Sequence, residues 1–233
     1  MVSVNNIAVI PARGGSKRIP RKNIKEFCSK PMIFWSIQAA KNSGLFDEIF
    51  VSTDDEEIAN LAKKLGAIIP FTRPKNLSDD FSTTHDVIFH AASFFNDANY
   101  IFDNICCLYP CSPFIQSEDL HEAFNLLKNK KNCYIYPITE YPHPISRALQ
   151  LSKDNRISLF NREHEKTRTQ DLVSAYHDAG QFYWGSKETW LKIDQIHSNA
   201  FGLPIPSWRA IDIDNEDDWK RAEIAFKALN YGS

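Results

Sequence analysis

The amino-acid sequence predicts an α/β fold in three layers, with helices on both faces of a mostly parallel sheet. Short apolar segments alternate with amphipathic ones along most of the 233 residues, which is typical of parallel strands joined by helices. A glycine-containing loop ends the first apolar segment, as at the carboxyl end of the first strand in such sheets. The length suffices for one domain with its own hydrophobic core.

Local signals place the elements of the first half. Pro31 and Gly44 are typical of the two ends of a helix, because proline fits the first turn and glycine the residue after the last. Acidic residues at 54–57 favour a helix beginning there, since carboxylates stabilise its amino end. We therefore expect strands at 7–11, 48–53 and 67–71, and helices at 31–43, from 54–57 through Leu65, and near 82–95.

The second half begins with a fully apolar segment, 104–109, which is best placed in the middle of a sheet. Between about 140 and 180 the alternation stops, and 152–178 is polar and charged. We expect 140–180 to be an inserted flap or dimerisation arm within a single domain that spans 1–233. The remaining expected elements are a helix at 116–128, strands at 133–139, 181–184 and 209–214, and a last amphipathic helix at 216–229.

Composition excludes several classes of protein. With 27 basic and 29 acidic side chains the net charge is −2, whereas proteins that bind nucleic acid or a membrane surface are strongly basic. We therefore expect no nucleic-acid partner and no membrane partner. The five cysteines are odd in number and form no C-x-x-C pair, which favours reduced thiols in the cytoplasm over disulfides or a zinc site. No apolar segment approaches the ~20 residues that span a bilayer.

The loop after the first predicted strand predicts a phosphate site. Residues 13–22 carry five cations, and Gly14, Gly15 and Ser16 allow backbone N–H groups to turn inward. Neither G-x-x-x-x-G-K-[ST] nor G-x-G-x-x-G is present. So many cations suit a nucleoside triphosphate better than the pyrophosphate of a dinucleotide. The alternative is a solvated basic turn.

Asp212 and Asp214 form a candidate metal site. On a strand, residues two apart point to the same face, so these carboxylates would lie side by side. Two adjacent carboxylates repel each other unless a cation lies between them. Mg²⁺ suits such a pair, with water and phosphate oxygens completing its coordination. The alternative is a pair of surface carboxylates at a strand edge.

Two further segments carry candidate binding residues. The segment 73–84 follows the third predicted strand, where Arg73 could hold a nucleotide, although its Asp and Ser residues are equally suited to cap the next helix. The segment 167–183 combines arginine, amide, histidine and tyrosine side chains, which suits an acidic, polyhydroxylated ligand, and Arg168 could pair with its carboxylate. His177 and Asp178 are adjacent and no activated Ser or Cys is evident, so we reject a catalytic triad.

In combination these motifs resemble the acylneuraminate cytidylyltransferases over nearly the whole chain. The resemblance is carried by the segments 10–23, 51–54, 73–80, 112–114 and 212–214, and the segments 167–171 and 176–185 place it nearest to the enzymes that use pseudaminic acid. It implies a Rossmann-like (GT-A-type) nucleotidyltransferase sheet. It also implies CTP and a nine-carbon acidic sugar as substrates, Mg²⁺ as cofactor, CMP-sugar and diphosphate as products, and a homodimer.

The resemblance, taken with the residue types above, implies three overlapping sets of site residues. The catalytic set is Arg13, Lys22 and Asp212, and the metal set is Asp212 and Asp214. The nucleotide set is Ala12, Arg13, Gly14, Gly15, Ser16, Lys22, Asn23, Arg73 and Thr84. The sugar set is Tyr109, Arg168, Gln170, His177, Gln181 and Tyr183.

The sequence departs from the sialic acid enzymes at two positions of the sugar set. Many of those enzymes have glutamine where this chain has Tyr109, and an arginine where it has His177. Both departures favour a nine-carbon acid other than N-acetylneuraminate. Legionaminate, N-acetylneuraminate or another ulosonic acid remain alternatives, as does a nucleotide-binding regulator without turnover.

Overall fold

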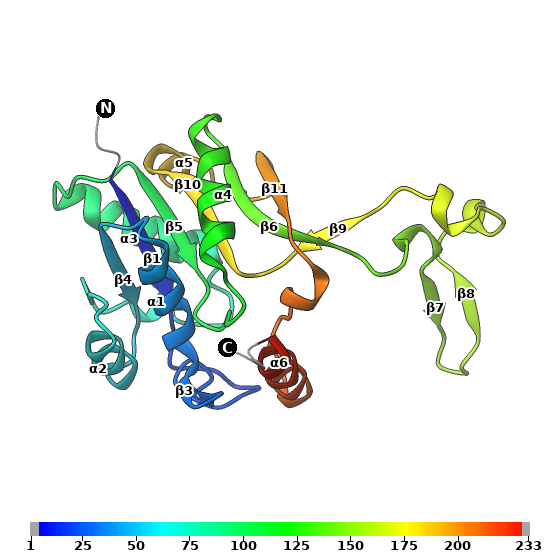
Figure 1. Cartoon of the computed structure of the whole chain (residues 1–233), viewed down its shortest axis with the longest axis horizontal. Helices are drawn as coiled ribbons and strands as arrows, with labels where there is room; N and C mark the ends of the chain where they lie inside the picture. Colours follow the sequence, from blue (N-terminus) through cyan, green and yellow to red (C-terminus); the bar gives the residue numbers. More distant parts are fainter. Residues whose placement is uncertain (1–4, 230–233) are drawn as a thin grey trace.

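A twisted sheet forms the centre of the molecule (Figure 1). The computed structural model describes residues 5–229, and within them this sheet has seven strands in the order β11-β6-β10-β5-β1-β4, with β9 beside β6. The pairings give five strands one direction, and only β9 and β10 oppose it. The predicted mostly parallel α/β fold is therefore confirmed. The strands are β1 (Asn6–Pro11), β4 (Glu48–Ser52), β5 (Asn104–Leu108), β6 (Tyr134–Glu140), β9 (Tyr176–Asp178), β10 (Phe182–Ser186) and β11 (Ala200–Pro204).

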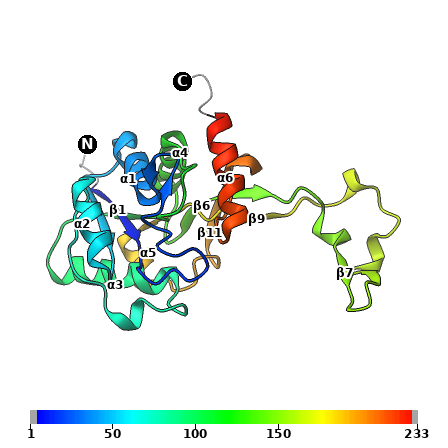
Figure 2. The same cartoon turned by 90° about the horizontal axis from the view of Figure 1, so that it is seen from below.

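Helices cover both faces of the sheet, as Figure 2 shows. One face packs against α1, α2 and α4, and the other against α3 and α5. A third apolar cluster joins α6 to the short hairpin β2–β3 and the start of α1. The helices are α1 (Met32–Ser43), α2 (Glu56–Lys64), α3 (Thr84–Asp97), α4 (Ser117–Lys128), α5 (Lys187–Lys192) and α6 (Glu216–Leu229), and the hairpin is β2 (Glu26–Phe27) with β3 (Lys30–Pro31).

Local signals explain where these helices begin and end. Pro31 precedes the first residue of α1, and Gly44 ends it with a φ of 62°, a left-handed conformation that glycine adopts without strain. The Asp55 carboxylate accepts a hydrogen bond from Ile58 N at the start of α2. At α3 the cap is Thr83, which forms a capping box with Asp86, and not one of the Asp or Ser residues before it.

Two expected strands are wrong. Residues 67–71 follow the outer edge of β4 but form only isolated bridges, at Ile68 and again at Thr72. Pro70 has no N–H to donate there, so no continuous ladder forms. Residues 209–214, expected as a strand, form none within the described chain: Arg209 ends the 3₁₀ helix Ser207–Arg209, and 210–214 are irregular. The edge beside β6 is taken by β11, which the sequence reading missed.

Residues 141–175, here called the arm, project away from the sheet between β6 and β9 (Figures 1 and 2). The arm contains a short hairpin, and most of its side chains are exposed. Its elements are β7 (Leu149–Leu151), β8 (Ile157–Leu159) and the 3₁₀ helices η2 (Ile145–Arg147), η3 (Arg162–His164) and η4 (Thr169–Asp171); η1 (Lys75–Leu77) and η5 (Ser207–Arg209) lie in the body. Within residues 5–229, no helix has both the length and the apolar character needed to cross a membrane.

Candidate active site

The basic loop, residues 12–25, begins where β1 ends. Ala12 is fully buried and donates its N–H to the carbonyl of Ser52, which ties the start of the loop to β4. Gly14 donates its N–H to Asp54 Oδ1 at 3.0 Å. A Cβ at Gly14 would lie 2.6 Å from Asp55 Oδ2, so a side chain at this position would force the Asp55 carboxylate at the start of α2 to move.

A cavity of about 650 Å³ lies against the basic loop. Its floor is formed by the carboxyl ends of β1 and β5, where ligand sites of α/β sheets occur. The cations that line it are Arg13, Lys17, Arg18, Lys22 and Arg73. Such a concentration of positive charge in a concave site favours an anionic ligand.

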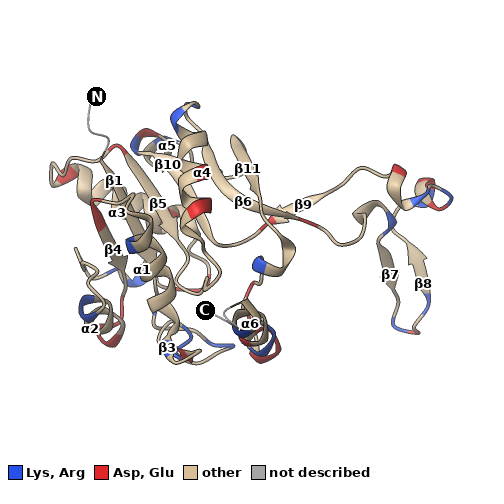
Figure 3. Cartoon of the chain, viewed as in Figure 1, with Lys and Arg blue, Asp and Glu red and all other residues tan. Residues whose placement is uncertain are grey.

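Carboxylates reach the same cavity from the other end of the chain. Asp212 and Asp214 both line it, although the segment that carries them is not a strand. Lys22 Nζ donates to the carbonyl of Ile213 at 2.6 Å and lies 3.6 Å from Asp214 Oδ1. Arg18 pairs with Asp214 at 2.8 Å. In Figure 3 the basic loop accordingly runs close to the start of α6. The structure thus brings together the two charged groups that the sequence analysis expected to share a site.

Asp212 fits a role as a cation ligand. Its side chain is accessible, yet its pKa is raised, first because the surrounding protein removes part of its hydration and second because Asp214 lies close. Lys22 opposes this shift but does not cancel it. A divalent cation beside Asp212 would favour its charged form.

The set of ligands suits Mg²⁺ better than zinc. Among residues 5–229, no group of three or more His, Cys, Asp or Glu side chains is arranged to hold a metal ion. Two carboxylates beside a phosphate site match the way proteins bind Mg²⁺, which keeps several waters and takes oxygens from phosphates. The residues present therefore fit the predicted ion.

A second cavity, also about 650 Å³, adjoins the first and shares Thr83, Thr84 and Tyr109 with it. Tyr183 and the loop after α5, residues 194–198, also line it. Tyr109 and Thr84 share a hydrogen bond of 2.6 Å, and the Tyr183 hydroxyl donates to Asp178 Oδ2 at 2.8 Å. Burial raises the pKa of both tyrosines, so their hydroxyls stay protonated at neutral pH.

Comparison with known proteins agrees with this geometry. A family model described as "Cytidylyltransferase" matches residues 7–200. The chain belongs to the cytidylyltransferase family. It is 44% identical to the pseudaminic acid cytidylyltransferase of Campylobacter jejuni over 227 residues, which cover 96% of this chain and 97% of that protein. It is 29% identical to an N-acylneuraminate cytidylyltransferase of Escherichia coli, over 93% of this chain and 51% of that one.

Solved structures support the fold. A CMP:2-keto-3-deoxy-manno-octonic acid synthetase complexed with CTP superposes with a TM-score of 0.69 at 16% identity, covering 97% of this chain and 99% of that chain. A 4-diphosphocytidyl-2C-methyl-D-erythritol synthase superposes with a TM-score of 0.67 at 12% identity, covering 97% and 100%. At such identities the likeness concerns the fold alone. The predicted nucleotidyltransferase sheet is confirmed.

Most residues of the predicted nucleotide set lie at the first cavity of this cytidylyltransferase. Ser16, Asn23 and Thr84 line it together with the cations Arg13, Lys22 and Arg73. Ala12, Gly14 and Gly15 do not line it. Ala12 is buried behind the loop and Gly14 turns its N–H toward Asp54, whereas Gly15 is exposed.

The Arg73 guanidinium is fixed by hydrogen bonds to Ser52 at the end of β4. Its Nε donates to Ser52 Oγ at 3.1 Å and its Nη2 to the Ser52 carbonyl, and only 4% of the residue is exposed. Burial lowers its pKa to about 10, so the guanidinium remains charged at neutral pH. It therefore presents a fixed charge at the end of β4.

The Asn23 amide is oriented by two partners. Its Nδ2 donates to the carbonyl of Arg13 at 2.8 Å, and its Oδ1 accepts from Cys111 Sγ at 3.0 Å. Burial raises the pKa of the Cys111 thiol to about 12, so the thiol keeps the proton that it donates. The pair ties the basic loop to the loop after β5.

The predicted sugar set is divided. Tyr109 and Tyr183 line the second cavity. His177 lines neither cavity: its ring packs on that of Tyr141, with 4.7 Å between the ring centroids, and its Nδ1 shares a hydrogen bond with the Asp178 carbonyl. Gln181 is 3% exposed and donates to the carbonyl of Arg209 at 2.7 Å. Its amide nitrogen therefore anchors the segment that leads to the aspartates, and the residue lines neither cavity.

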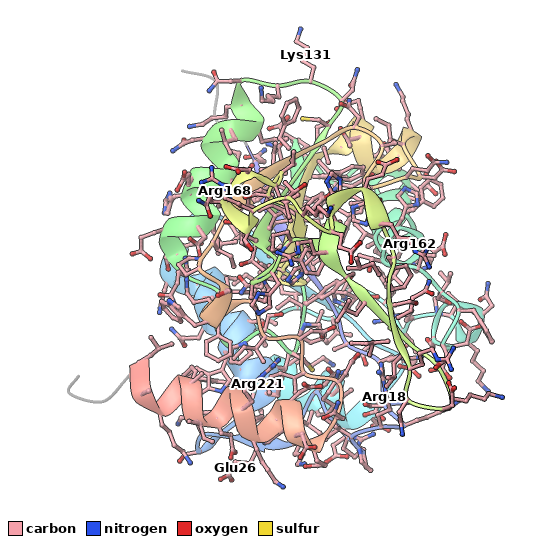
Figure 4. The ribbon with its side chains drawn as sticks, turned by 90° about the vertical axis from the view of Figure 1, so that its right-hand side faces the viewer. Arg18, Glu26, Lys131, Arg162, Arg168 and Arg221 are labelled. Atoms are coloured by element: carbon pink, nitrogen blue, oxygen red, sulfur yellow. The ribbon has the colours of Figure 1, made fainter. Side chains whose placement is uncertain are left out.

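Arg168 and Gln170 lie on the arm, away from both cavities of their own chain. Both residues are exposed, and Arg168 pairs with Asp171 at 2.7 Å. Figure 4, viewed from the side of the arm, shows Arg168 on the arm, whereas Arg18 belongs to the basic loop of the body. A contact from these residues to a ligand in the described cavities requires another chain or a different position of the arm.

Sequence reasoning missed several groups that line the cavities. Asp80 was considered only as a helix cap, although it faces the basic loop. The loop 194–198 carried no motif, and nothing in its composition singled it out. The carbonyl of Ile213, which holds Lys22, is a backbone group that sequence patterns do not reveal.

Proposed function

We propose that this cytidylyltransferase transfers the cytidylyl group of CTP to a nonulosonic acid, namely pseudaminic acid, and releases diphosphate. The observation that carries the proposal is the meeting of the basic loop with Asp212 and Asp214 in one cavity. The choice of sugar is supported by the 44% identity to a pseudaminic acid cytidylyltransferase over nearly the full length of both chains.

In the proposed reaction the anomeric hydroxyl of the sugar attacks the α-phosphate of CTP. A bond forms between the sugar oxygen and the α-phosphorus, and the bond from the α-phosphorus to the oxygen that bridges it to the β-phosphate breaks. The hydroxyl proton passes to solvent, and diphosphate leaves. Arg13 and Lys22 bind phosphate oxygens and stabilise the charge that develops on the departing diphosphate. Asp212 and Asp214 would hold Mg²⁺, which supplies neutralising charge at the phosphates when bound. The rest of the catalysis is positioning of the two substrates.

The second cavity is the proposed place of the sugar. It shares Thr84 and Tyr109 with the first cavity, so a sugar bound there would lie beside the proposed site of CTP. Neutral tyrosine hydroxyls and aromatic faces suit a deoxygenated, acylated sugar better than charged side chains would. Tyr109, which stands where many sialic acid enzymes have glutamine, lies at the junction of the two cavities.

A panel of substrates tests this proposal. Diphosphate release is measured with CTP, ATP, GTP and UTP against pseudaminate, legionaminate and N-acetylneuraminate, each with Mg²⁺. We expect turnover with CTP and the highest kcat/KM with pseudaminate. A higher kcat/KM with another acid refutes the choice of sugar. Binding of CTP without diphosphate release from any acid refutes the proposed activity.

We further propose a homodimer in which the arm of one chain completes the site of its partner. The arm exposes large apolar side chains, including Leu151 at 69%, Ile157 at 64% and Phe160 at 64%, and such groups on a soluble surface favour an interface. It also carries Arg168 and Gln170, which do not reach the cavities of their own chain.

Complementation tests the arm. Lys22→Met and Arg168→Ala chains are produced separately and together in one cell. If the arm acts across the dimer, mixed dimers keep one complete site, and the mixture regains about a quarter of the wild-type activity. No gain over the separate variants contradicts the proposal.

Free thiols at all five cysteines are consistent with a cytoplasmic enzyme.

A further inference from the structure

The cations of the basic loop already have anionic partners within the chain. Asp80 lies between two of them: its Oδ1 is 2.7 Å from Arg13 Nη1, and its Oδ2 is 2.5 Å from Lys17 Nζ. Arg13 Nη1 also donates to the carbonyl of Asp79 at 2.5 Å. The segment 79–83 is thereby connected across the first cavity to the basic loop.

The position of Asp80 is fixed by its neighbours. The Asp79 carboxylate accepts hydrogen bonds from Phe81 N at 3.0 Å, from Ser82 N at 2.8 Å and from Ser82 Oγ at 2.7 Å. Thr83 then caps α3 through its capping box. Asp79 therefore shapes the turn, and the next carboxylate is left facing Arg13 and Lys17.

Among the residues described, four carboxylates line this cavity: Asp79, Asp80, Asp212 and Asp214. Asp79 is engaged by the turn, and Asp212 and Asp214 are the proposed ligands of Mg²⁺. When a metal–triphosphate complex binds, Asp214 can exchange its cations for the metal. Asp80 has no such replacement: the phosphates bind its partners Arg13 and Lys17, and no other cation among residues 5–229 forms an ion pair with it.

We propose that Asp80 occupies, in the unliganded chain, the place of a phosphate group on Arg13 and Lys17, and that its displacement sets the affinity for the triphosphate and for the diphosphate product. This inference rests on the proposed function for the identity of the anion. Asp80 then weakens the binding of phosphates and thereby favours release of the product. Without its carboxylate, the basic loop binds diphosphate more tightly.

The expected change has the opposite sign to that of an ordinary binding residue. Replacing the carboxylate by an amide frees Arg13 and Lys17 and removes a negative charge that faces the incoming anion. Exposed ion pairs are individually weak, so we expect affinity to rise roughly threefold to tenfold and not by orders of magnitude. The gain should shrink as salt is added, because exposed charges are screened.

The test compares the wild type with Asp80→Asn, Asp80→Glu and Asp97→Asn. Asp97 is exposed at the far end of α3, so its variant matches the change of net charge away from the cavity. Calorimetry measures binding of CTP with Mg²⁺, without the sugar, and separately of inorganic diphosphate. We expect Asp80→Asn to bind both more tightly and to be inhibited by diphosphate at lower concentration. Asp80→Glu, which keeps the charge, and Asp97→Asn should bind as the wild type does.

The outcomes separate this inference from the proposed function. Equal or weaker binding by Asp80→Asn, in a wild type that binds both ligands, overturns the role of Asp80 alone. An equal gain in Asp97→Asn overturns it too, since net charge would then explain the effect. A wild type that binds diphosphate but not CTP overturns the proposed function, while the diphosphate data still decide the role of Asp80. Binding of neither ligand overturns both.

Discussion

Lys22 connects the two charged sides of the cavity, and its replacement by methionine is the sharpest test of the site. Its Nζ donates to the Ile213 carbonyl at 2.6 Å and lies 3.6 Å from Asp214. Methionine keeps an unbranched side chain of similar length without the charge. The change therefore removes one cation from the proposed phosphate site while leaving the packing of the loop nearly intact.

The expected loss of activity greatly exceeds the loss of stability. Removing one donor to a charge that develops in the transition state typically lowers kcat by about 10²–10³, or roughly 3–4 kcal/mol. The Lys22 side chain is 21% exposed and that of Asp214 is 35% exposed, so their ion pair is partly screened by solvent. We therefore expect the free energy of unfolding to change by no more than about 1 kcal/mol.

The assay is diphosphate release at saturating CTP, Mg²⁺ and sugar, with urea unfolding in parallel. Lys25→Met is the matched control, because Lys25 lies in the same loop but pairs with Glu216 at 2.8 Å, packs over Trp219 and does not line the cavity. Its kcat should stay near that of the wild type. A Lys22→Met enzyme whose kcat is within threefold of the wild type would refute the assignment, as would an equal loss in both variants.

Two predictions concern stability. Hydrogen bonding from Arg21 lowers the pKa of Asp55 in the folded chain. Its charged carboxylate therefore stabilises the fold fully above the unfolded aspartate pKa of about 4, and this stabilisation is lost as pH falls through the lower pKa of the folded state. Asp55→Asn should therefore cost about 1 kcal/mol in urea at pH 7, and the cost should shrink as pH falls below about 4; a cost that stays the same over this range would contradict this reasoning. Arg209→Ala leaves the nearly buried Asp119 without its partner, and we expect a loss of about 3 kcal/mol in the same measurement. Arg209→Lys, which keeps a charge there, should recover part of that loss.

Elements whose signals are local were predicted closely. Pro31 and Gly44 bound α1 as expected, and α6 occupies the predicted range 216–229. The basic loop begins directly after the buried strand β1, as the apolar segment followed by Gly14 and Gly15 predicted. These features depend on neighbours within a few residues, and the sequence displays such neighbours directly.

Strand assignments failed where pairing decides the outcome. Residues 209–214 have strand-like composition, yet they pair with no strand among residues 5–229, and β11 occupies the edge of the sheet beside β6. Residues 67–71 follow β4 with interrupted hydrogen bonds. A strand forms only where another backbone lies beside it in register. Composition does not reveal which segment lies along the edge of the sheet in the folded chain.

The sequence also did not reveal which way the side chains of the predicted sugar set point. Phe182 and Trp184 face the core under α1 and α4, so Tyr183 between them faces the opposite side, toward Tyr109. Gln181, one residue earlier, turns instead to the carbonyl of Arg209. Residues of similar chemistry thus divide between ligand cavity and scaffold according to the register of β10.

The sequence by itself determined the α/β architecture, the basic loop after β1 and the pair of aspartates near the carboxyl end. Each of these features follows from the pattern of residues within a short segment or from the alternation of such segments. Only the tertiary structure decided that Lys22 lies against the Ile213 carbonyl, that Asp80 faces Arg13, and that the arm carries Arg168 away from the cavities of its own chain. Contacts between residues far apart in the chain arise from the packing of the sheet and its loops, and that packing depends on all of the core at once.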